Sequence, residues 1–198
     1  MNLLKISLFH VASVALLATC PLAAAVEGPL NIIFDTDVDH DCDDIGALYT
    51  LHEAVQRGEA NLLATIGCTS TDEIAPALDA INTWFGRPEI PVGTLKDKGL
   101  IDHKGFAADL IKHYPSKFSS GKDYPDAVAL YRETLAKQPD GSIVVLAVGP
   151  LRNLANLLKS RPDKASPLDG AALVAKKVKQ LEINYTVSTT GSACFGDL

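Results

Sequence analysis

The sequence predicts an α/β fold in which a mostly parallel, open sheet carries helices on both faces. Short apolar runs of strand length alternate with segments in which apolar residues recur every three or four positions, as on one face of a helix. Glycine, proline and small polar residues separate the two kinds of segment. Strands that alternate with helices are typical of right-handed crossovers between parallel strands. One sheet with helices on both faces is therefore expected.

Four apolar runs have the length of buried strands, and polar residues, glycine or proline bound them. In chain order they lie at 30–34, 62–67, 90–92 and 142–148. Pro91 weakens the third run, because proline cannot donate a hydrogen bond to a neighbouring strand. The fourth run is the strongest, since it consists largely of Ile, Val and Leu.

Apolar residues at helical spacing predict five helices around these strands. In chain order they lie at 45–55, 73–85, 106–114, 126–137 and 151–159. Gly58 ends the first helix, Asp72 is placed as the N-cap of the second, and Pro150 can occupy the first turn of the last. Trp84 and Phe85, at the end of the second helix, are expected in the core.

Six carboxylates fall within the ten residues that follow the first strand. They are Asp35, Asp37, Asp39, Asp41, Asp43 and Asp44. In open α/β sheets, ligands bind at the carboxyl ends of the strands. Carboxylates this close together repel one another unless a cation neutralises them. A crowded set of oxygen ligands favours Ca²⁺ over the smaller Mg²⁺, so we expect a Ca²⁺ site, with a solvated acidic turn as the alternative.

Spacing tests two other kinds of site in the same stretch. An EF-hand loop that began at Asp35 would have His40 at position 6 and Gly46 at position 12, where that loop needs Gly and Glu, so it is excluded. An aspartate-nucleophile phosphatase also places Asp-x-Asp after a first strand, and this alternative stays open although Asp39 stands where a hydroxyl residue is usual. Asp39 and Asp41 are equally well explained as extra ligands or as solvated charges.

Residues 1–25 have the pattern of a signal peptide, so a secreted or periplasmic protein with one domain over 26–198 is expected. Lys5 precedes a mostly apolar stretch, and three alanines end at Ala25. The apolar stretch is too short for a stable membrane anchor. Three cysteines remain beyond residue 25, and Cys42 and Cys68, both at strand ends, could pair.

The composition argues against a nucleic-acid partner. The formal net charge is -6, and lysine and arginine form no basic stripe that could neutralise phosphates. Hydrophobic residues make up 47% of the chain, which is ordinary for one globular domain.

Three motifs in order carry a family resemblance. They are Asp35-Thr36-Asp37 with Asp43-Asp44 and Ala47-Leu48, then Ala80-Ile81-Asn82 through Ile90-Pro91-Val92-Gly93, and Leu146 through Ala155. Together they resemble the amino-terminal part of the calcium-dependent nucleoside hydrolases of the inosine-uridine preferring type, which cleave the N-glycosidic bond of ribonucleosides. The resemblance implies a Rossmann-like core. One departure is that Asp37 and Asp43 lie two residues further apart than in the best-known members.

The resemblance also implies roles for individual residues. Asp37 matches the residue that touches Ca²⁺ and acts as general base, and Asp44 matches the bidentate calcium ligand. Val148 matches a position whose backbone carbonyl completes the metal site. A base in contact with a metal-bound water is coherent with hydrolysis through an oxocarbenium-like transition state.

Three more residues complete the expected site. Asp43 matches the carboxylate that binds the ribose 2′ and 3′ hydroxyls. Asp35 and Asn153 are expected to support the metal ligands from behind, with Asn153 bonding backbone groups of the loop. The expected small-molecule partner is a ribonucleoside. Association of the chain into a homo-oligomer is left open.

The resemblance covers only part of the family pattern. Residues 181–185 take the place of a central strand, but family members continue well beyond the point that corresponds to Leu198, so the chain is expected to lack a carboxy-terminal part. Two functions follow from this. One is hydrolysis of ribonucleosides, and the other is a secreted, inactive remnant that binds Ca²⁺ or ribose without turnover.

Overall fold

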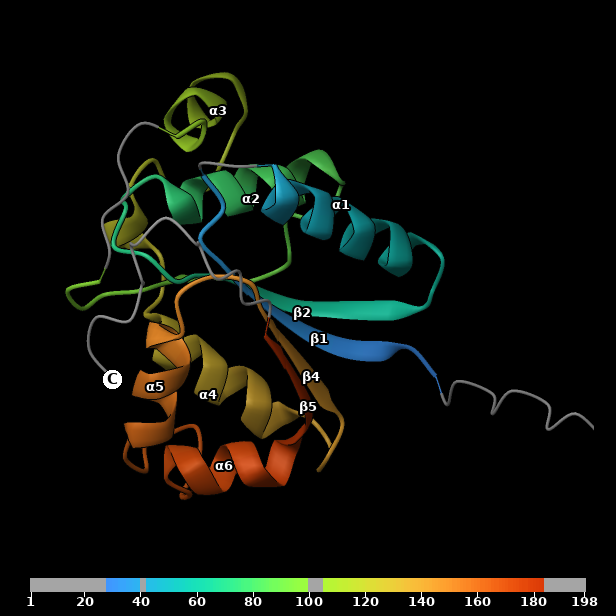
Figure 1. Cartoon of the computed structure of the whole chain (residues 1–198), viewed down its shortest axis with the longest axis vertical. Helices are drawn as coiled ribbons and strands as arrows, with labels where there is room; N and C mark the ends of the chain where they lie inside the picture. Colours follow the sequence, from blue (N-terminus) through green and yellow to red (C-terminus); the bar gives the residue numbers. More distant parts are fainter. Residues whose placement is uncertain (1–27, 40–41, 100–104, 184–198) are drawn as a thin grey trace, which may run out of the picture.

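The computed structural model describes residues 28–39, 42–99 and 105–183, and its centre is a five-stranded sheet (Figure 1). The strands are β1 Leu30–Thr36, β2 Ala60–Gly67, β3 Val92–Thr94, β4 Ile143–Ala147 and β5 Val178–Ile183. Their order across the sheet is β3-β2-β1-β4-β5, and each neighbouring pair is parallel. The predicted α/β class with a parallel sheet is confirmed.

Helices cover both faces of this sheet. They are α1 Asp43–Gln56, α2 Ile74–Trp84, α3 Ala107–His113, the 3-10 helix η1 Gly121–Asp123, α4 Ala127–Lys137, α5 Arg152–Lys159 and α6 Gly170–Lys177. In Figure 1, α1 and α2 lie above the sheet, while α4, α5 and α6 lie below it. This arrangement is the one that right-handed crossovers on alternate sides of a parallel sheet produce.

Side chains that alternate along the strands feed two separate hydrophobic cores. Phe34 packs with the α1 and α2 layer, and its neighbour Ile33 packs with the α4, α5 and α6 layer, both with no exposed surface. Burying one such side chain stabilises a fold by about 1.5 to 3 kcal/mol. The two cores hold β1 at the middle of the sheet, with Asp35 as its second-last residue and Asp37 directly after its end.

Two expectations for α2 are wrong. Asp72 does not cap the helix: α2 begins at Ile74 without a side-chain cap, and the Asp72 carboxylate accepts a hydrogen bond from Ser120 Oγ at 2.9 Å. Trp84 is 71% exposed rather than in the core, and its ring meets the Tyr114 ring edge-on. Phe85 is partly buried, because it stacks on His52 at 4.3 Å between ring centroids.

The carboxy-terminal part of the described chain contains a helix that the sequence pattern did not predict. Asp169 caps α6 by accepting a hydrogen bond from Ala172 N at 2.8 Å. Gly170 lies directly against the Leu157 carbonyl at the end of α5, where a Cβ would overlap it. Because α6 passes straight into β5, this strand begins at Val178, earlier than the predicted 181, and the last predicted residues 184–185 lie outside the described residues.

Some predictions fall on residues outside the described ranges, and one concerns a disulfide. The signal peptide at 1–25, His40 and Asp41 lie outside them. Among the residues that the structure describes, no helix is long and apolar enough to cross a membrane. Cys42 is exposed and Cys68 is buried, and both are free thiols, so the suggested pairing is not formed.

Candidate active site

The carboxyl ends of β1, β2 and β4 meet at one edge of the sheet. Thr36 pairs with Gly67, and Asp35 pairs with Ala147, so the residues that follow these strands are neighbours. Cys68 N donates to the Thr36 carbonyl and Val148 N donates to the Asp35 carbonyl, both at 2.9 Å. The direction of strand order reverses between β1 and β4, and open α/β sheets bind ligands at such a point. These contacts bring the loops after β1, β2 and β4 together at one edge of the sheet.

Asp35 lies beneath this edge and ties three elements together. Its carboxylate is 2% exposed and accepts a hydrogen bond from Tyr131 Oη of α4 at 2.7 Å. Asn153 Nδ2 of α5 donates to the same carboxylate at 3.3 Å and to the Gly67 carbonyl at 3.0 Å. Burial raises the pKa of Asp35 to about 7, while the bonds from Tyr131 and Asn153 oppose the shift.

The Asp37 carboxylate lies between the ends of β2 and β4. A Cβ on Gly149 would overlap Asp37 Oδ1 and would lie 2.7 Å from Cys68 Sγ, so only glycine leaves room for both side chains. Burial raises the pKa of the Cys68 thiol well above its ordinary value, and nearby carboxylates, Asp35 and Asp37 among them, raise it further. Cys68 is therefore a neutral thiol that borders Asp37, and not a thiolate nucleophile.

Asp44 faces Asp37 from the first turn of α1. Its side chain is buried at 5% exposure. Burial raises the pKa of Asp44 to about 7, the Thr36 hydroxyl opposes the shift, and Asp37 and Asp43 add to it by repulsion and, for Asp37, by a hydrogen bond. Two carboxyl groups that hydrogen bond to each other share a proton, so this pair carries less than two negative charges near neutral pH.

Asp43 differs from Asp37 and Asp44 because it is exposed. Its Oδ1 accepts a hydrogen bond from Asp44 N at 3.1 Å, as an acidic residue in the first turn of a helix can do. The carboxylate thus stands at the rim of the site, where a ligand from solvent can reach it.

The donor chemistry of the site fits a hard cation in part. Carboxylate oxygens suit Ca²⁺, and a cation could replace the proton that Asp37 and Asp44 share. Asn153 Oδ1 is in addition a buried acceptor without a hydrogen-bond partner in the described part of the chain. The same described residues contain no group of three His, Cys, Asp or Glu side chains placed to hold a metal ion. Asp37 and Asp44 therefore fit a hard cation. The described residues place no third acidic side chain beside them as a ligand.

Sequence reasoning missed the parts of the site that lie far apart in the chain. Asp39 is not a solvated charge, because it is 3% exposed and accepts a hydrogen bond from Ala107 N at 2.8 Å. Gly149 and Cys68 border Asp37, and their positions directly after predicted strands were the available signal. Thr36, which bonds Asp44, lies two residues beyond the strand predicted at 30–34.

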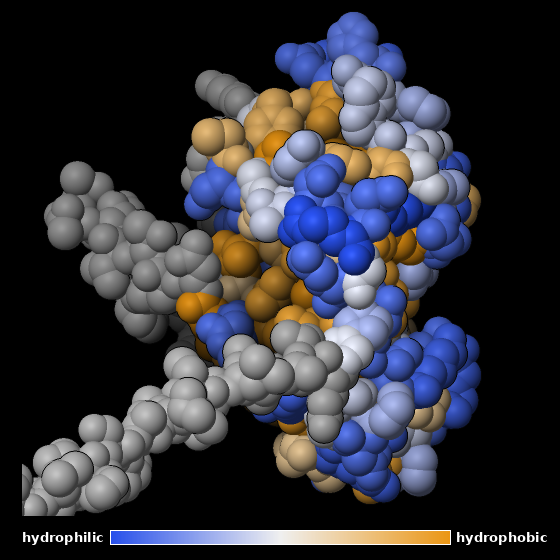
Figure 2. All heavy atoms as spheres, turned by 90° about the vertical axis from the view of Figure 1, so that its right-hand side faces the viewer, coloured by the Kyte–Doolittle hydropathy of each residue, from blue (hydrophilic) through white to orange (hydrophobic). Residues whose placement is uncertain are grey.

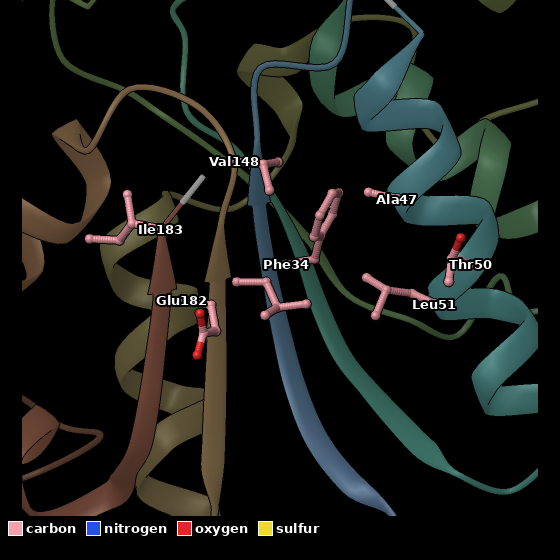
Figure 3. Close-up of a pocket in the computed structure, with 8 residues that line it drawn as sticks. Phe34, Ala47, Thr50, Leu51, Val148, Glu182 and Ile183 are labelled. Carbon is pink, nitrogen blue, oxygen red and sulfur yellow. The ribbon is translucent and has the colours of Figure 1, made fainter. Parts of the chain in front are cut away.

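An apolar groove of about 490 Å³ runs beside the site. Ala47 and Leu51 of α1 line one wall, and Phe34, Leu146 and Val148 line the sheet side. Figure 3 shows Phe34 and Leu51 between α1 and the strands, with Glu182 and Ile183 on β5. Figure 2 shows apolar surface gathered in a hollow between the two helical layers. The groove is open and lacks acidic residues other than Glu182, so the chemistry of the site rests on the carboxylates above.

Comparison with known proteins supports the fold. No family model and no curated protein matches the sequence. Among solved structures, the effector protein XOO4466 is similar with a TM-score of 0.63 and 19% identity, over 79% of this chain and 44% of that one. The type III effector protein XopQ, in complex with adenosine diphosphate ribose, is similar with a TM-score of 0.59 and 17% identity, over 79% and 43%. The chain thus shares the α/β fold of these effectors and spans less than half of their length.

Proposed function

We propose that this protein hydrolyses the N-glycosidic bond of ribonucleosides, as a nucleoside hydrolase. The observation that carries the proposal is the hydrogen-bonded pair of Asp37 and Asp44 at the carboxyl end of the central strand, with Asp43 exposed beside it. The complex of XopQ with adenosine diphosphate ribose supports a ribose-containing ligand for this fold. The motif resemblance to calcium-dependent nucleoside hydrolases supports the same reaction.

Each carboxylate has a separate task in this proposal. Asp37 is the general base: it is only partly buried, and its oxygen Oδ1 lies against Gly149, which brings no side chain that could block a water. Asp43 is positioned at the rim to accept hydrogen bonds from the 2′ and 3′ hydroxyls of ribose. Negative charge around the sugar stabilises the positive charge that develops as the N-glycosidic bond breaks.

Ca²⁺ is the cofactor of the proposal. Asp37 and Asp44 would hold it, together with the backbone carbonyl of Val148, while Asp35 and Asn153 fix the strand end from behind. When bound, Ca²⁺ supplies a water that loses its proton more easily. With a cation held at this site, the Asp44 carboxyl, whose pKa is raised to about 7, would be in its charged form as a ligand beside Asp37.

Hydrolysis of p-nitrophenyl riboside in the presence of Ca²⁺ tests the proposal. The phenolate leaves without a proton, so this substrate needs only the base and the sugar contacts. Asp37→Asn should abolish hydrolysis, and Asp44→Asn should abolish a calorimetric signal for Ca²⁺. Asp109→Asn, in an exposed carboxylate that pairs with Lys112 on α3, is the matched control and should change neither. Hydrolysis that survives in Asp37→Asn would contradict the assignment.

Ribose binding without turnover is the second candidate. It is favoured by the lack of a third acidic metal ligand among the described residues and by the ribose-containing ligand of XopQ. Calorimetry with adenosine diphosphate ribose should then show binding to the wild type and weaker binding to Asp43→Asn, with no hydrolysis of the phenyl riboside by either protein.

Export is a further part of the proposal. The pattern of residues 1–25 supports a signal peptide that is removed after Ala25. Amino-terminal sequencing of protein recovered from a secreting host should begin at Val26, and a start at Met1 would contradict export.

A further inference from the structure

We propose that Asp39 is a positioning residue that fixes the direction of Asp37 by binding the start of α3. The proposal rests on the function inferred above for Asp37. It concerns the stretch in which the loop after β1 is longer than in the best-known nucleoside hydrolases. The contacts that carry it lie on both sides of Asp37.

The first set of contacts joins Asp39 to a distant segment. Asp39 Oδ1 accepts a hydrogen bond from Ala107 N at 2.8 Å, and the Asp39 carbonyl accepts one from Phe106 N at 3.0 Å. The side chain and the main chain of one residue are thus both bound to the amino-terminal end of α3, 68 positions further along the chain. Because Asp39 is 3% exposed, water cannot easily take over either bond.

Gly105 shows how closely the two segments approach each other. A Cβ on this residue would overlap the Asp39 carboxyl group. The backbone before α3 therefore lies directly on the Asp39 side chain, and glycine is needed there for lack of space. This close approach is a second observation, beside the hydrogen bonds, that the Asp39 side chain packs against the segment before α3.

The other neighbour of Asp37 is equally fixed. Val38 has no exposed surface and packs in the core beneath α1 and α2, and its N–H donates to Thr36 Oγ1 at 3.1 Å. Asp37 therefore stands between the end of β1 on one side and a buried Val38 and anchored Asp39 on the other. Its carboxylate can reach the space beside Gly149 only while this short stretch keeps its course.

Three variants separate positioning from a direct effect of charge. Asp39→Asn keeps an acceptor oxygen for Ala107 N and removes the charge. Asp39→Ala removes both, and Gly105→Ala keeps the carboxylate but pushes it away. If Asp39 positions Asp37, Asp39→Ala and Gly105→Ala lower kcat for p-nitrophenyl riboside by about 10- to 100-fold with little change in KM, since a displacement of about 1 Å can cost that much. Asp39→Asn then stays within a few-fold of the wild type.

Amide hydrogen exchange supplies a readout that does not depend on activity. Exchange at Ala107 and at Val38 should be faster in Asp39→Ala than in the wild type and unchanged in Asp39→Asn, at equal thermal stability of the remaining sheet. If the wild type hydrolyses no riboside, the proposed function fails while the exchange pattern still decides whether Asp39 holds this loop. Asp39→Asn as damaging as Asp39→Ala, or unchanged exchange at Val38 in Asp39→Ala, would overturn the proposal.

Discussion

Lowering the pH should destabilise this protein through one buried histidine, His52 of α1. His52 is 1% exposed, and its Nε2 lies 3.1 Å from Asn82 Oδ1. Asn82 Nδ2 donates to Thr65 Oγ1 at 3.0 Å, which orients the Asn82 oxygen towards the ring. Nε2 therefore carries the proton, and Nδ1 is left to accept from Arg87 Nη1 at 3.2 Å. A second proton, on Nδ1, would lie against the positively charged guanidinium of Arg87.

The magnitude follows from the shift in the pKa of His52. This pKa is lowered from 6.5 to about 4, chiefly by burial and next by the charge of Arg87, while the Asn82 bond opposes the shift. The unfolded chain therefore takes up the proton first as the pH falls. Stability is lost between the two values, and at about pH 4.5 the loss amounts to about 2 to 3 kcal/mol of the free energy of unfolding.

Urea denaturation of the wild type and of His52→Gln at about pH 7.5 and about pH 4.5 measures this loss. The difference between the two proteins is the quantity to compare, because Asp35 and Asp44 have raised pKa values and add stability as the pH falls in both. Arg87→Gln is the control, and it should reduce the pH dependence without removing it. Equal pH dependence in the wild type and in His52→Gln would refute the reasoning.

Three further substitutions probe contacts around the site and the core by chemical denaturation. Tyr131→Phe removes a donor from the buried Asp35 carboxyl and should cost about 1 to 3 kcal/mol, and a neutral result would mean that water replaces the hydroxyl. Arg132→Met removes a 2% exposed guanidinium that lies 2.9 Å from Asp163 and should cost about 3 kcal/mol, unless repacking offsets the lost charge pair. Trp84→Ala should cost no more than about 1 kcal/mol, because the ring is 71% exposed and meets the Tyr114 ring edge-on, and a larger loss would indicate contacts of the ring beyond this pair.

The elements that the sequence predicted well are those whose pattern lies within a short stretch of the chain. The strand predicted at 30–34 is part of β1, Leu30–Thr36, and the one predicted at 142–148 contains β4, Ile143–Ala147. A buried strand is a short apolar run wherever it occurs, so its pattern is visible without its partners. The order of loops at the sheet edge then follows from parallel strands, and Asp35, Asp37 and Asp44 are placed correctly at that edge.

The features that the sequence did not predict depend on contacts between distant segments. Trp84 is a large apolar residue of the kind usually found in a core. The path of α2 relative to the sheet nevertheless leaves its ring in solvent. Asp72 has the right residue type for an N-cap, but Ser120 and Gly121 of a later segment bind it instead. The burial of Asp39 depends on Ala107 in the same way. Residue type gives the chemistry that a side chain can perform, and the distant partner decides which part of it is used.

The carboxylates after β1 show this division of roles most clearly. Asp35 is held under the strand end by Tyr131 and Asn153, and Asp39 is held by the start of α3. Neither can turn towards a ligand without giving up a buried hydrogen bond, which costs about 1 to 3 kcal/mol. Asp37 and Asp44 instead hydrogen bond to each other, an arrangement that needs a shared proton and that a cation can replace. Within this stretch the proposed metal ligation and base catalysis therefore fall to that pair, and the proposed ribose contact falls to the exposed Asp43.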